Sequence, residues 1–200
     1  MERRADAPVD EDELLRANWY GLLARLLGNP PDDAVLATLG RTLGDETELG
    51  RALDALAAVA RERSAAEVRQ EHFDLFVGVG QPQLLPYGSY YLAGFLHDKP
   101  LARLRGDMGR LGVARAGGVH ESEDHVASLC EIMAGLAVGA FGAPVPVSEQ
   151  HDFFAKHLGC WAPRFFADLE KAPDAVFYRP VGTIGRLFMA VESEAFEMAA

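Results

Sequence analysis

Residues 122–141 read SEDHVASLCEIMAGLAVGAF. The large apolar side chains of this stretch recur at steps of three and four residues: Leu129, Ile132, Met133 and Leu136. Such spacing puts them on one face of an α-helix, and the acidic residues at its beginning suit the positive end of the helix dipole. We therefore predict a helix over about residues 122–141, with this face turned to a core.

The same spacing returns along most of the chain. Apolar positions between residues 12 and 27 precede the sequence GNPP at 28–31, which ends a helix. Ser64 and Glu67 have the spacing of a capping box, so we expect a helix from there to about Phe76. Val35, Leu36, Leu39 and Leu43 are expected to share one short helix. Further helices are expected at 89–96 and at 100–111, and another begins at about residue 47. In the last quarter of the chain we expect one helix that begins near 148, one that ends near 171, and one that runs from 180 to near the C-terminus.

These patterns predict an all-α fold, since no two runs alternate apolar and polar residues around a hairpin turn. We expect residues 1–200 to form a single, bundle-like domain of about nine to ten helices, because 49% hydrophobic content supplies a core for a chain of 200 residues. Residues 1–12 are expected to form a flexible tail. The glycine-rich stretch near 112–120 is expected to join an N-terminal and a C-terminal helical half.

Composition argues against several classes of protein. The net charge of −11 disfavours nucleic-acid binding, which needs a basic surface. No run reaches the roughly 18 apolar residues of a membrane helix, and the charged N-terminus lacks the apolar core of a secretory signal. We therefore expect a cytoplasmic protein that is not an integral membrane protein. Cys130 and Cys160 are far apart and form no CxxC pair, so reduced thiols are expected rather than a zinc site.

Each common enzyme template fails on a specific residue. Gly78-Val-Gly80 would need a third glycine where Gln83 stands to form a dinucleotide fingerprint. His120-Glu121 is followed by His125, one residue too late for the metalloprotease spacing. We therefore expect no catalytic residue, no metal and no cofactor. An acid/base pair of His125 with Glu121 or Asp124 is kept as a weaker hypothesis.

Two segments carry the functional hypothesis. The first reads EHFDLFVGVG at 71–80 and continues through LLPYGSYY at 84–91. It places aromatic and apolar groups beside a glycine-rich break between helices, where grooves form and binding sites are frequent, although any one of them could equally fill the core. The second reads ESEDH at 121–125. On a helical wheel, His125 falls at the margin of the apolar stripe, with Glu121 one turn before it.

Together the two segments resemble the TorD/DmsD family of redox-enzyme maturation chaperones, which is related to NarJ. The family pattern has an acidic residue, then Leu-Phe, a glycine-containing stretch and Pro-x-x-Ser-x-Tyr, followed later by Glu-Pro-x-Asp-His. This chain offers Glu71, Leu75-Phe76, Gly78, PYGSYY at 86–91 and ESEDH at 121–125. Ser122 stands where the family usually has proline. The resemblance covers roughly residues 14–195.

The resemblance implies an all-α chaperone that binds the twin-arginine leader, the apo form of a molybdoenzyme catalytic subunit, or both. It would assist cofactor insertion and hold back premature export. Carried over position by position, it implies leader contacts at Leu75, Phe76, Pro86, Tyr87, Ser89, Tyr91, Asp124 and His125. We add His72, one turn before Phe76, and Glu121, one turn before His125.

Physical reasoning supports this picture, since an apolar groove would take the apolar part of a leader and an acidic rim its arginines. The alternative is a helical adaptor without preference for twin-arginine leaders. The sequence leaves the client enzyme open, and it is compatible with a monomer or a homodimer.

Overall fold

The computed structural model describes residues 10–80, 82–96, 98–115, 121–142 and 145–199, and these residues contain α-helices and no β-strand. The helices in chain order are α1 (Glu11–Gly28), α2 (Asp33–Leu39), α3 (Glu48–Glu62), α4 (Ala65–His72), α5 (Gly88–Ala93), α6 (Lys99–Arg110), α7 (Val126–Val138), α8 (Val147–His157), α9 (Ala162–Lys171) and α10 (Tyr178–Ala199). A π-helical turn, Phe73–Val77, continues α4. The all-α prediction is confirmed.

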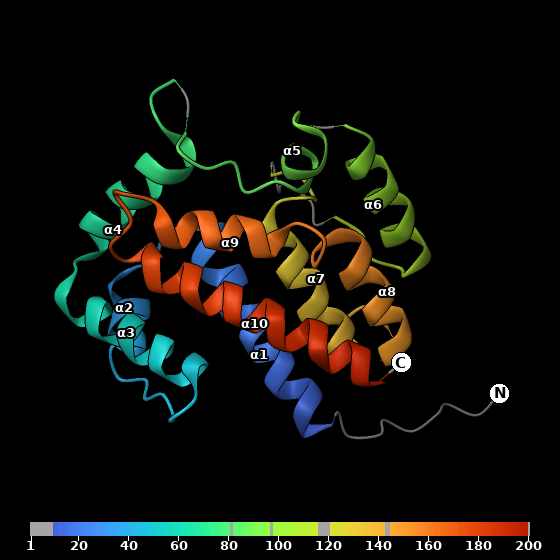
Figure 1. Ribbon diagram of the computed structural model, residues 1–200, viewed down its shortest axis with the longest axis horizontal. Helices are drawn as coiled ribbons and strands as arrows, with labels where there is room; N and C mark the ends of the chain where they lie inside the picture. The colour runs from blue at the N-terminus through green and yellow to red at the C-terminus, as the bar shows by residue number, and fades with distance from the viewer. Residues whose placement is uncertain (1–9, 81, 97, 116–120, 143–144, 200) are drawn as a thin grey trace.

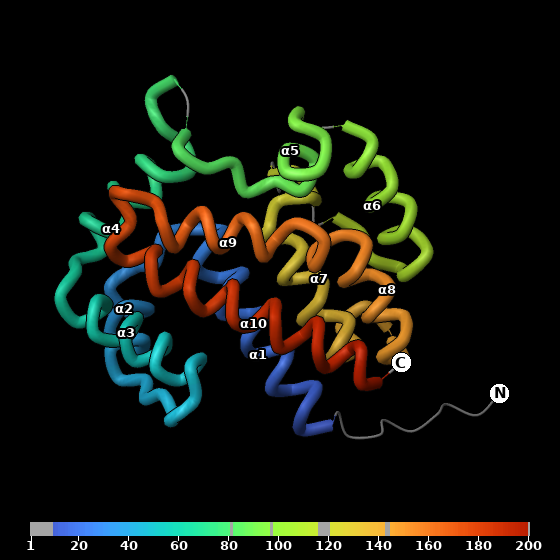
Figure 2. Tube along the Cα trace, viewed as in Figure 1, coloured from blue at the N-terminus to red at the C-terminus, as the bar shows by residue number. Residues whose placement is uncertain are grey.

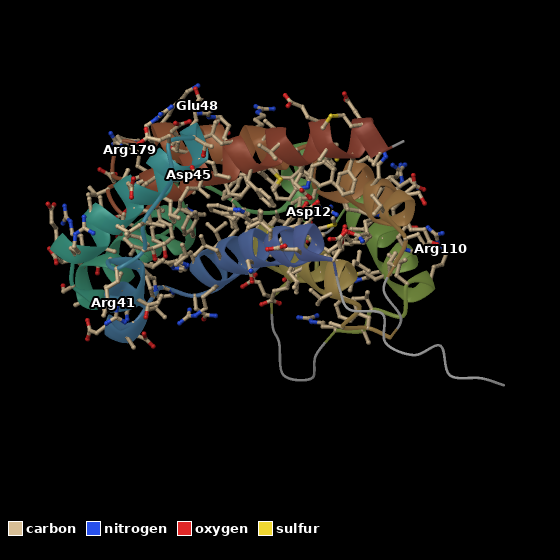
Figure 3. The ribbon with its side chains drawn as sticks, turned by 90° about the horizontal axis from the view of Figure 1, so that it is seen from below. Asp12, Arg41, Asp45, Glu48, Arg110 and Arg179 are labelled. Atoms are coloured by element: carbon tan, nitrogen blue, oxygen red, sulfur yellow. The ribbon has the colours of Figure 1, made fainter. Side chains whose placement is uncertain are left out.

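The helices form two layers around one core. α9 and α10 pack side by side in one layer, and α1 packs on α7 in the other (Figure 1). When the molecule is turned by 90°, α10 lies above α1 and α7 (Figure 3). α3 extends the layer of α10, and α8 contacts both α7 and α10. The segment between the π-helical turn and α5 then crosses the molecule near α9 (Figure 2).

Local capping chemistry sets several helix starts, as expected. The Ser64 hydroxyl accepts the backbone N–H of Glu67, and the Glu67 carboxylate accepts the backbone N–H of Ser64, which completes the predicted capping box. The Thr47 hydroxyl caps α3 by accepting the N–H of Gly50. Each bond satisfies a backbone donor that has no partner inside its helix.

Two sequence expectations are wrong in detail. α2 ends at Leu39, so Leu43 lies outside the helix and is 85% exposed instead of sharing its apolar stripe. α7 begins at Val126 rather than near Ser122, because the backbone of residues 124–126 pairs with that of residues 86–88 instead. Residues 1–9 of the expected tail and residues 116–120 of the expected joining segment lie outside the described residues. α1 already begins at Glu11.

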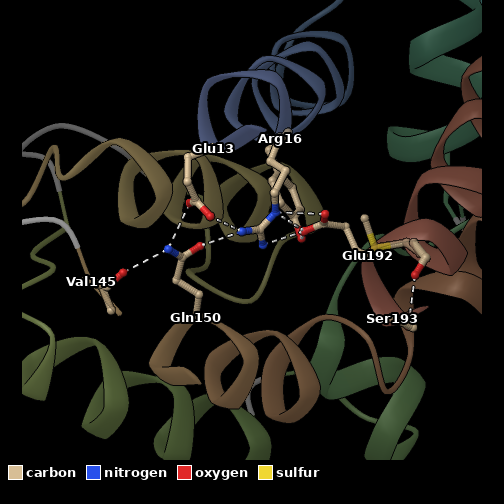
Figure 4. Close-up of polar contacts among 8 residues, drawn as sticks. Glu13, Arg16, Val145, Gln150, Glu192 and Ser193 are labelled. Atoms are coloured by element: carbon tan, nitrogen blue, oxygen red, sulfur yellow. Dashed lines mark hydrogen bonds and ion pairs between the residues drawn. The ribbon is translucent and has the colours of Figure 1, made fainter. Parts of the chain in front are cut away.

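A charged cluster fastens the C-terminal helix to the rest of the fold (Figure 4). The Arg16 guanidinium of α1 donates to both carboxylate oxygens of Glu192 in α10, with Nε–Oε1 at 3.0 Å and Nη2–Oε2 at 2.9 Å. It also donates to Glu13 at 2.7 Å and to Gln150 of α8 at 3.2 Å. The Tyr20 hydroxyl donates to Glu192 at 2.7 Å. Because Glu192 is only 1% exposed, these donors compensate for a carboxylate removed from water.

The exterior of the molecule is largely charged. Asp45 and Glu48 near the start of α3, together with Arg110 and Arg179, lie on the outside in Figure 3. Within the described parts of the chain, no helix combines the length and the apolar character needed to span a membrane.

Candidate functional site

The two segments singled out in the sequence lie against each other. Tyr87 and His125 form an isolated antiparallel β-bridge. The N–H of Val126 donates to the carbonyl of Pro86 at 2.8 Å, and the N–H of Gly88 donates to the carbonyl of Asp124 at 2.9 Å. The ring of Tyr87 meets the His125 ring edge-on, with centroids 5.1 Å apart. We call residues 86–89 and 122–126 the junction.

Asp124 holds the junction together through its side chain. One carboxylate oxygen accepts the backbone N–H of Ser89 at 2.8 Å, and the other accepts the Ser122 hydroxyl at 2.5 Å. All three residues are buried. Ser122, at a position where the resemblance leads one to expect proline, therefore contributes a side-chain hydrogen bond to this turn.

His125 is the N-cap of α7. Its Nδ1 accepts the backbone N–H of Ala127 at 3.1 Å, which requires that this nitrogen carry no proton. Burial lowers the pKa of His125 to about 4, although the nearby carboxylate of Glu121 opposes this shift. The imidazole is therefore neutral at pH 7. His125 precedes α7, so the helical-wheel position predicted for it is wrong, while its place beside the apolar face and Glu121 remains.

The Leu75–Phe76 pair belongs mainly to the core. Leu75 is fully buried in the π-helical turn, and its carbonyl accepts the N–H of Leu84 at 2.9 Å. Phe76 is half-buried and packs edge-on against Tyr178 at 5.3 Å and His72 at 5.0 Å between ring centroids. Burial lowers the pKa of His72, and its Nε2 has no hydrogen-bond partner among the residues that the structure describes.

Tyr91, the last residue of the first segment, packs against α9 and the residue that precedes it. Its hydroxyl donates to Asp168 of α9 at 3.0 Å, and its ring packs against Trp161, with centroids 5.5 Å apart. Next to it, the residues of and after α5 present apolar side chains to solvent: Tyr90, Leu92, Phe95 and Leu96.

Tyr87 and Glu121 are the predicted site residues that remain accessible at the junction. The Tyr87 hydroxyl donates to the Glu121 carboxylate. Beside Glu121 lies a cavity of about 340 Å³, which we call the α7 cavity. Its apolar wall comes from α6, α7 and the segments that follow them: Met108, Val113, Ala114, Ile132, Gly135, Ala140 and Phe141. Its polar groups are Arg115, Glu121, Glu123, Ser128 and Glu131.

The structure brings the predicted residues of 86–89 and 121–125 together at the junction, whereas Leu75 and Phe76 pack in the core, and of all the predicted residues Glu121 alone lines the α7 cavity. Five are buried and shape the site from beneath: Leu75, Pro86, Ser89, Asp124 and His125. His72, Phe76, Tyr87 and Tyr91 are half-buried, and Glu121 is exposed. The α7 cavity, whose lining includes the partly exposed Phe141, was not predicted from the sequence. The one feature of the sequence that could have indicated this cavity is the large apolar residue Phe141 at the end of a predicted apolar helix.

Other cavities flank the same region. One of about 640 Å³ lies between α5, α6 and α8 and includes Asp124 in its wall. Another, of about 420 Å³, lies between Leu84, Tyr91 and Arg164. A third, of about 700 Å³, lies between α1, α3 and α10, away from the junction. The α7 cavity differs from the first two in combining a mainly apolar wall with three glutamates.

Comparison with known proteins identifies relatives. A sequence model of the nitrate reductase delta subunit family matches residues 43–167. The chain is 31% identical over 135 residues to the chaperone protein TorD of Vibrio cholerae serotype O1 strain El Tor Inaba N16961, and 30% identical to that of strain Classical Ogawa 395. These matches cover 62% of this chain, and the chain spans 61% of the length of these relatives.

The fold also matches a solved structure. A crystal structure from Archaeoglobus fulgidus, described as a redox enzyme maturation protein, superposes with a TM-score of 0.58. The match covers 94% of this chain and 99% of the other, at 16% sequence identity. At this identity the match shows a shared fold. Together with the all-helical architecture, it confirms the predicted fold class.

Proposed function

Because this chain belongs to the nitrate reductase delta subunit family, whose TorD relatives are named chaperones, we propose that it is a cytoplasmic chaperone for a redox-enzyme precursor. It binds the twin-arginine leader of a molybdoenzyme catalytic subunit, or the apo form of that subunit. It assists cofactor insertion and delays export until insertion is complete. The leader docks at the α7 cavity, next to the junction.

The observation that carries this proposal is the composition of the α7 cavity. A twin-arginine leader has two cations followed by a modest apolar segment. The cavity is lined by apolar side chains that include Ile132 and Phe141 and by the carboxylates of Glu121, Glu123 and Glu131. The cationic part and the apolar part of the leader thus both find complementary groups in one cavity of the protein.

The energetics favour reversible binding. Burying an apolar anchor contributes about 1.5–3 kcal/mol, so three anchors contribute roughly 5–9 kcal/mol before the cost of ordering the peptide. An exposed arginine–carboxylate pair adds only about 0–1 kcal/mol. A micromolar affinity requires about 8 kcal/mol, so the apolar wall sets the affinity. The carboxylates set register and speed of association.

A peptide-binding measurement tests the proposal. Phe141 is 38% exposed and lines the cavity mouth, so Phe141→Asp should spare the fold. We expect its affinity for a twin-arginine leader peptide, measured by fluorescence anisotropy, to fall by at least about tenfold, the loss of one buried aromatic anchor. Leu43→Asp is the matched control, since Leu43 is 85% exposed and lies at the 700 Å³ cavity instead. Equal binding by both variants would remove the α7 cavity from the proposal.

Two alternatives have specific predictions. A helical adaptor without leader preference would bind twin-arginine and twin-alanine peptides equally. An enzyme using His125 as acid or base would need an accessible imidazole, but His125 is 7% exposed and its Nδ1 is committed to the backbone of Ala127. The TorD relatives are named chaperones, in agreement with the expectation of no catalytic residue.

A further inference from the structure

Glu123, at the rim of the α7 cavity, is approached by two arginines of the chain itself. Arg105 of α6 binds its carboxylate with both ends of the guanidinium, Nε–Oε1 at 3.2 Å and Nη2–Oε2 at 2.8 Å. Arg115 approaches the same carboxylate with Nη1–Oε1 at 3.9 Å. The Glu123 side chain is only 12% exposed, whereas those of Arg105 and Arg115 are 53% and 36% exposed. A fixed carboxylate thus lies beneath two outer guanidinium groups.

The two arginines are held differently. Arg105 makes a two-pronged contact, the strong geometry for guanidinium and carboxylate, and it is not part of the cavity wall. Arg115 lines the cavity, and among the described residues its closest polar contact is with the backbone carbonyl of Glu121, at 2.7 Å from Nη2. Its distance to the Glu123 carboxylate is at the outer limit of an ion pair. Arg115 is therefore the more easily released of the two.

The position of Arg115 corresponds to the place where an incoming cation would bind. Glu121 and Glu123 line the cavity together with its apolar residues, so a peptide whose apolar side chains enter the cavity can place a neighbouring residue against these carboxylates. There the donors of an arginine meet a carbonyl and a carboxylate, the same acceptors that Arg115 uses now. The Arg105 contact lowers the pKa of Glu123, so this carboxylate stays charged at neutral pH.

We propose that the Glu123 carboxylate binds an arginine of the client. In the free protein Arg115 occupies this position as an internal ligand, and the client arginine displaces it. This inference rests on the proposed leader-binding function and adds a specificity residue and a built-in competitor to it. The exchange replaces one partly exposed guanidinium with another at the same carboxylate. It therefore costs little and leaves Arg115 free to return when the client departs.

The exchange of Arg115 for a client arginine explains how the protein can prefer arginine-bearing peptides without binding them tightly. A peptide without arginine at this position fills the apolar wall but leaves Arg115 in place. A peptide with arginine must compete with Arg115, so the preference for arginine stays within the strength of one exposed ion pair. Removing Arg115 should therefore strengthen binding of arginine-bearing peptides and leave other peptides unaffected.

The test measures the affinities of a labelled twin-arginine leader peptide and its twin-alanine counterpart for three variants and the wild type. We expect Arg115→Gln to tighten binding of the twin-arginine peptide by about two- to fivefold, the range of an exposed ion pair, with no change for the twin-alanine peptide. Glu123→Gln should abolish the preference between the peptides. Arg63→Gln is the matched control, because the Arg63 side chain is also 36% exposed and also ion-paired, to Glu67 at 3.3 Å.

The outcomes separate the two proposals. If the wild-type protein binds both peptides equally, leader recognition itself is contradicted. If it prefers the twin-arginine peptide but Arg115→Gln behaves like Arg63→Gln, the internal-ligand inference is overturned while leader recognition stands. Should Glu123→Gln fail to fold, the comparison of Arg115→Gln with Arg63→Gln still decides, since both remove one exposed positive charge.

Discussion

The carboxylate of Asp124 accepts the backbone N–H of Ser89 at 2.8 Å, between residues 35 positions apart in the chain. This bond joins the start of α5 to the turn before α7, and it does so where water is excluded. The two sequence motifs therefore meet as one structural unit. Asp124 acts as a positioning residue, whereas contact with a client falls to the side chains around it.

Removing the Asp124 carboxylate should destabilise the junction. Asp124→Ala leaves the Ser89 N–H and the Ser122 hydroxyl without this acceptor, and we expect the free energy of unfolding to fall by about 2–4 kcal/mol. Asp124→Asn keeps one acceptor oxygen and should lose about half as much. Urea denaturation of both variants measures the difference. Equal stability of wild type and Asp124→Ala would show that the carboxylate does not hold the junction.

Glu71 should stabilise the start of α10. Its carboxylate accepts three consecutive backbone N–H groups, from Val176 at 2.8 Å, Phe177 at 3.0 Å and Tyr178 at 2.8 Å. Glu71→Gln replaces one acceptor oxygen with a donor, so we expect a loss of about 1–3 kcal/mol in the free energy of unfolding. Glu62→Gln, in the last turn of α3, is a control that should change stability by less than about 0.5 kcal/mol. A loss no greater than that of the control would contradict the assignment.

The neutral His125 should make stability fall in mild acid. Its folded pKa of about 4 lies below the unfolded value of 6.5, so the unfolded state takes up a proton first as pH falls. The stabilisation is complete above pH 6.5 and declines by up to about 1.4 kcal/mol per pH unit toward pH 4. His125→Asn keeps a capping acceptor but does not titrate. We therefore expect a flatter dependence for this variant between pH 7 and pH 5, measured by urea denaturation.

His72 and His157 contribute in the same direction, because burial lowers the pKa of each. The contribution of His157 cancels in the difference between wild type and His125→Asn, whereas the difference includes the repulsion between His72 and a charged His125. Parallel curves for the two proteins would be incompatible with a buried, neutral His125.

The Arg16 cluster should be far more sensitive to loss of one partner than of both. Arg16→Met leaves the Glu192 carboxylate buried without its main partner, and we expect a loss of about 3–5 kcal/mol. Adding Glu192→Gln removes the uncompensated charge and should recover part of that loss. Thermal and urea unfolding of the single and double variants test this. A double variant less stable than Arg16→Met would oppose it.

Features set by local chemistry were predictable from the sequence. The capping box at Ser64 and Glu67 depends on residues three positions apart, and it forms as expected. The start of α7 was not predictable in the same way. The backbone at 122–125 pairs with residues 86–88 instead of continuing the helix, and this contact spans a long stretch of chain. Tertiary hydrogen bonding overrode the local helical pattern.

The candidate site was predictable only in part for the same reason. The resemblance placed Leu75 and Asp124 in the site, but periodicity does not distinguish a buried wall from an exposed groove, and both are buried. Arg115 and Phe141 follow helices rather than lie within them. Their convergence on the α7 cavity depends on how α6 and α7 pack, which no short pattern records.

The most direct test of the account uses the two isoleucines of the chain, Ile132 and Ile184. Ile132 lines the α7 cavity, whereas Ile184 is 1% exposed in α10 and is not among the residues that line the α7 cavity. In protein labelled at isoleucine methyl groups, titration with a twin-arginine leader peptide should shift the Ile132 methyl signal and leave that of Ile184 in place. Saturating peptide binding with an unchanged Ile132 signal would contradict docking at the α7 cavity.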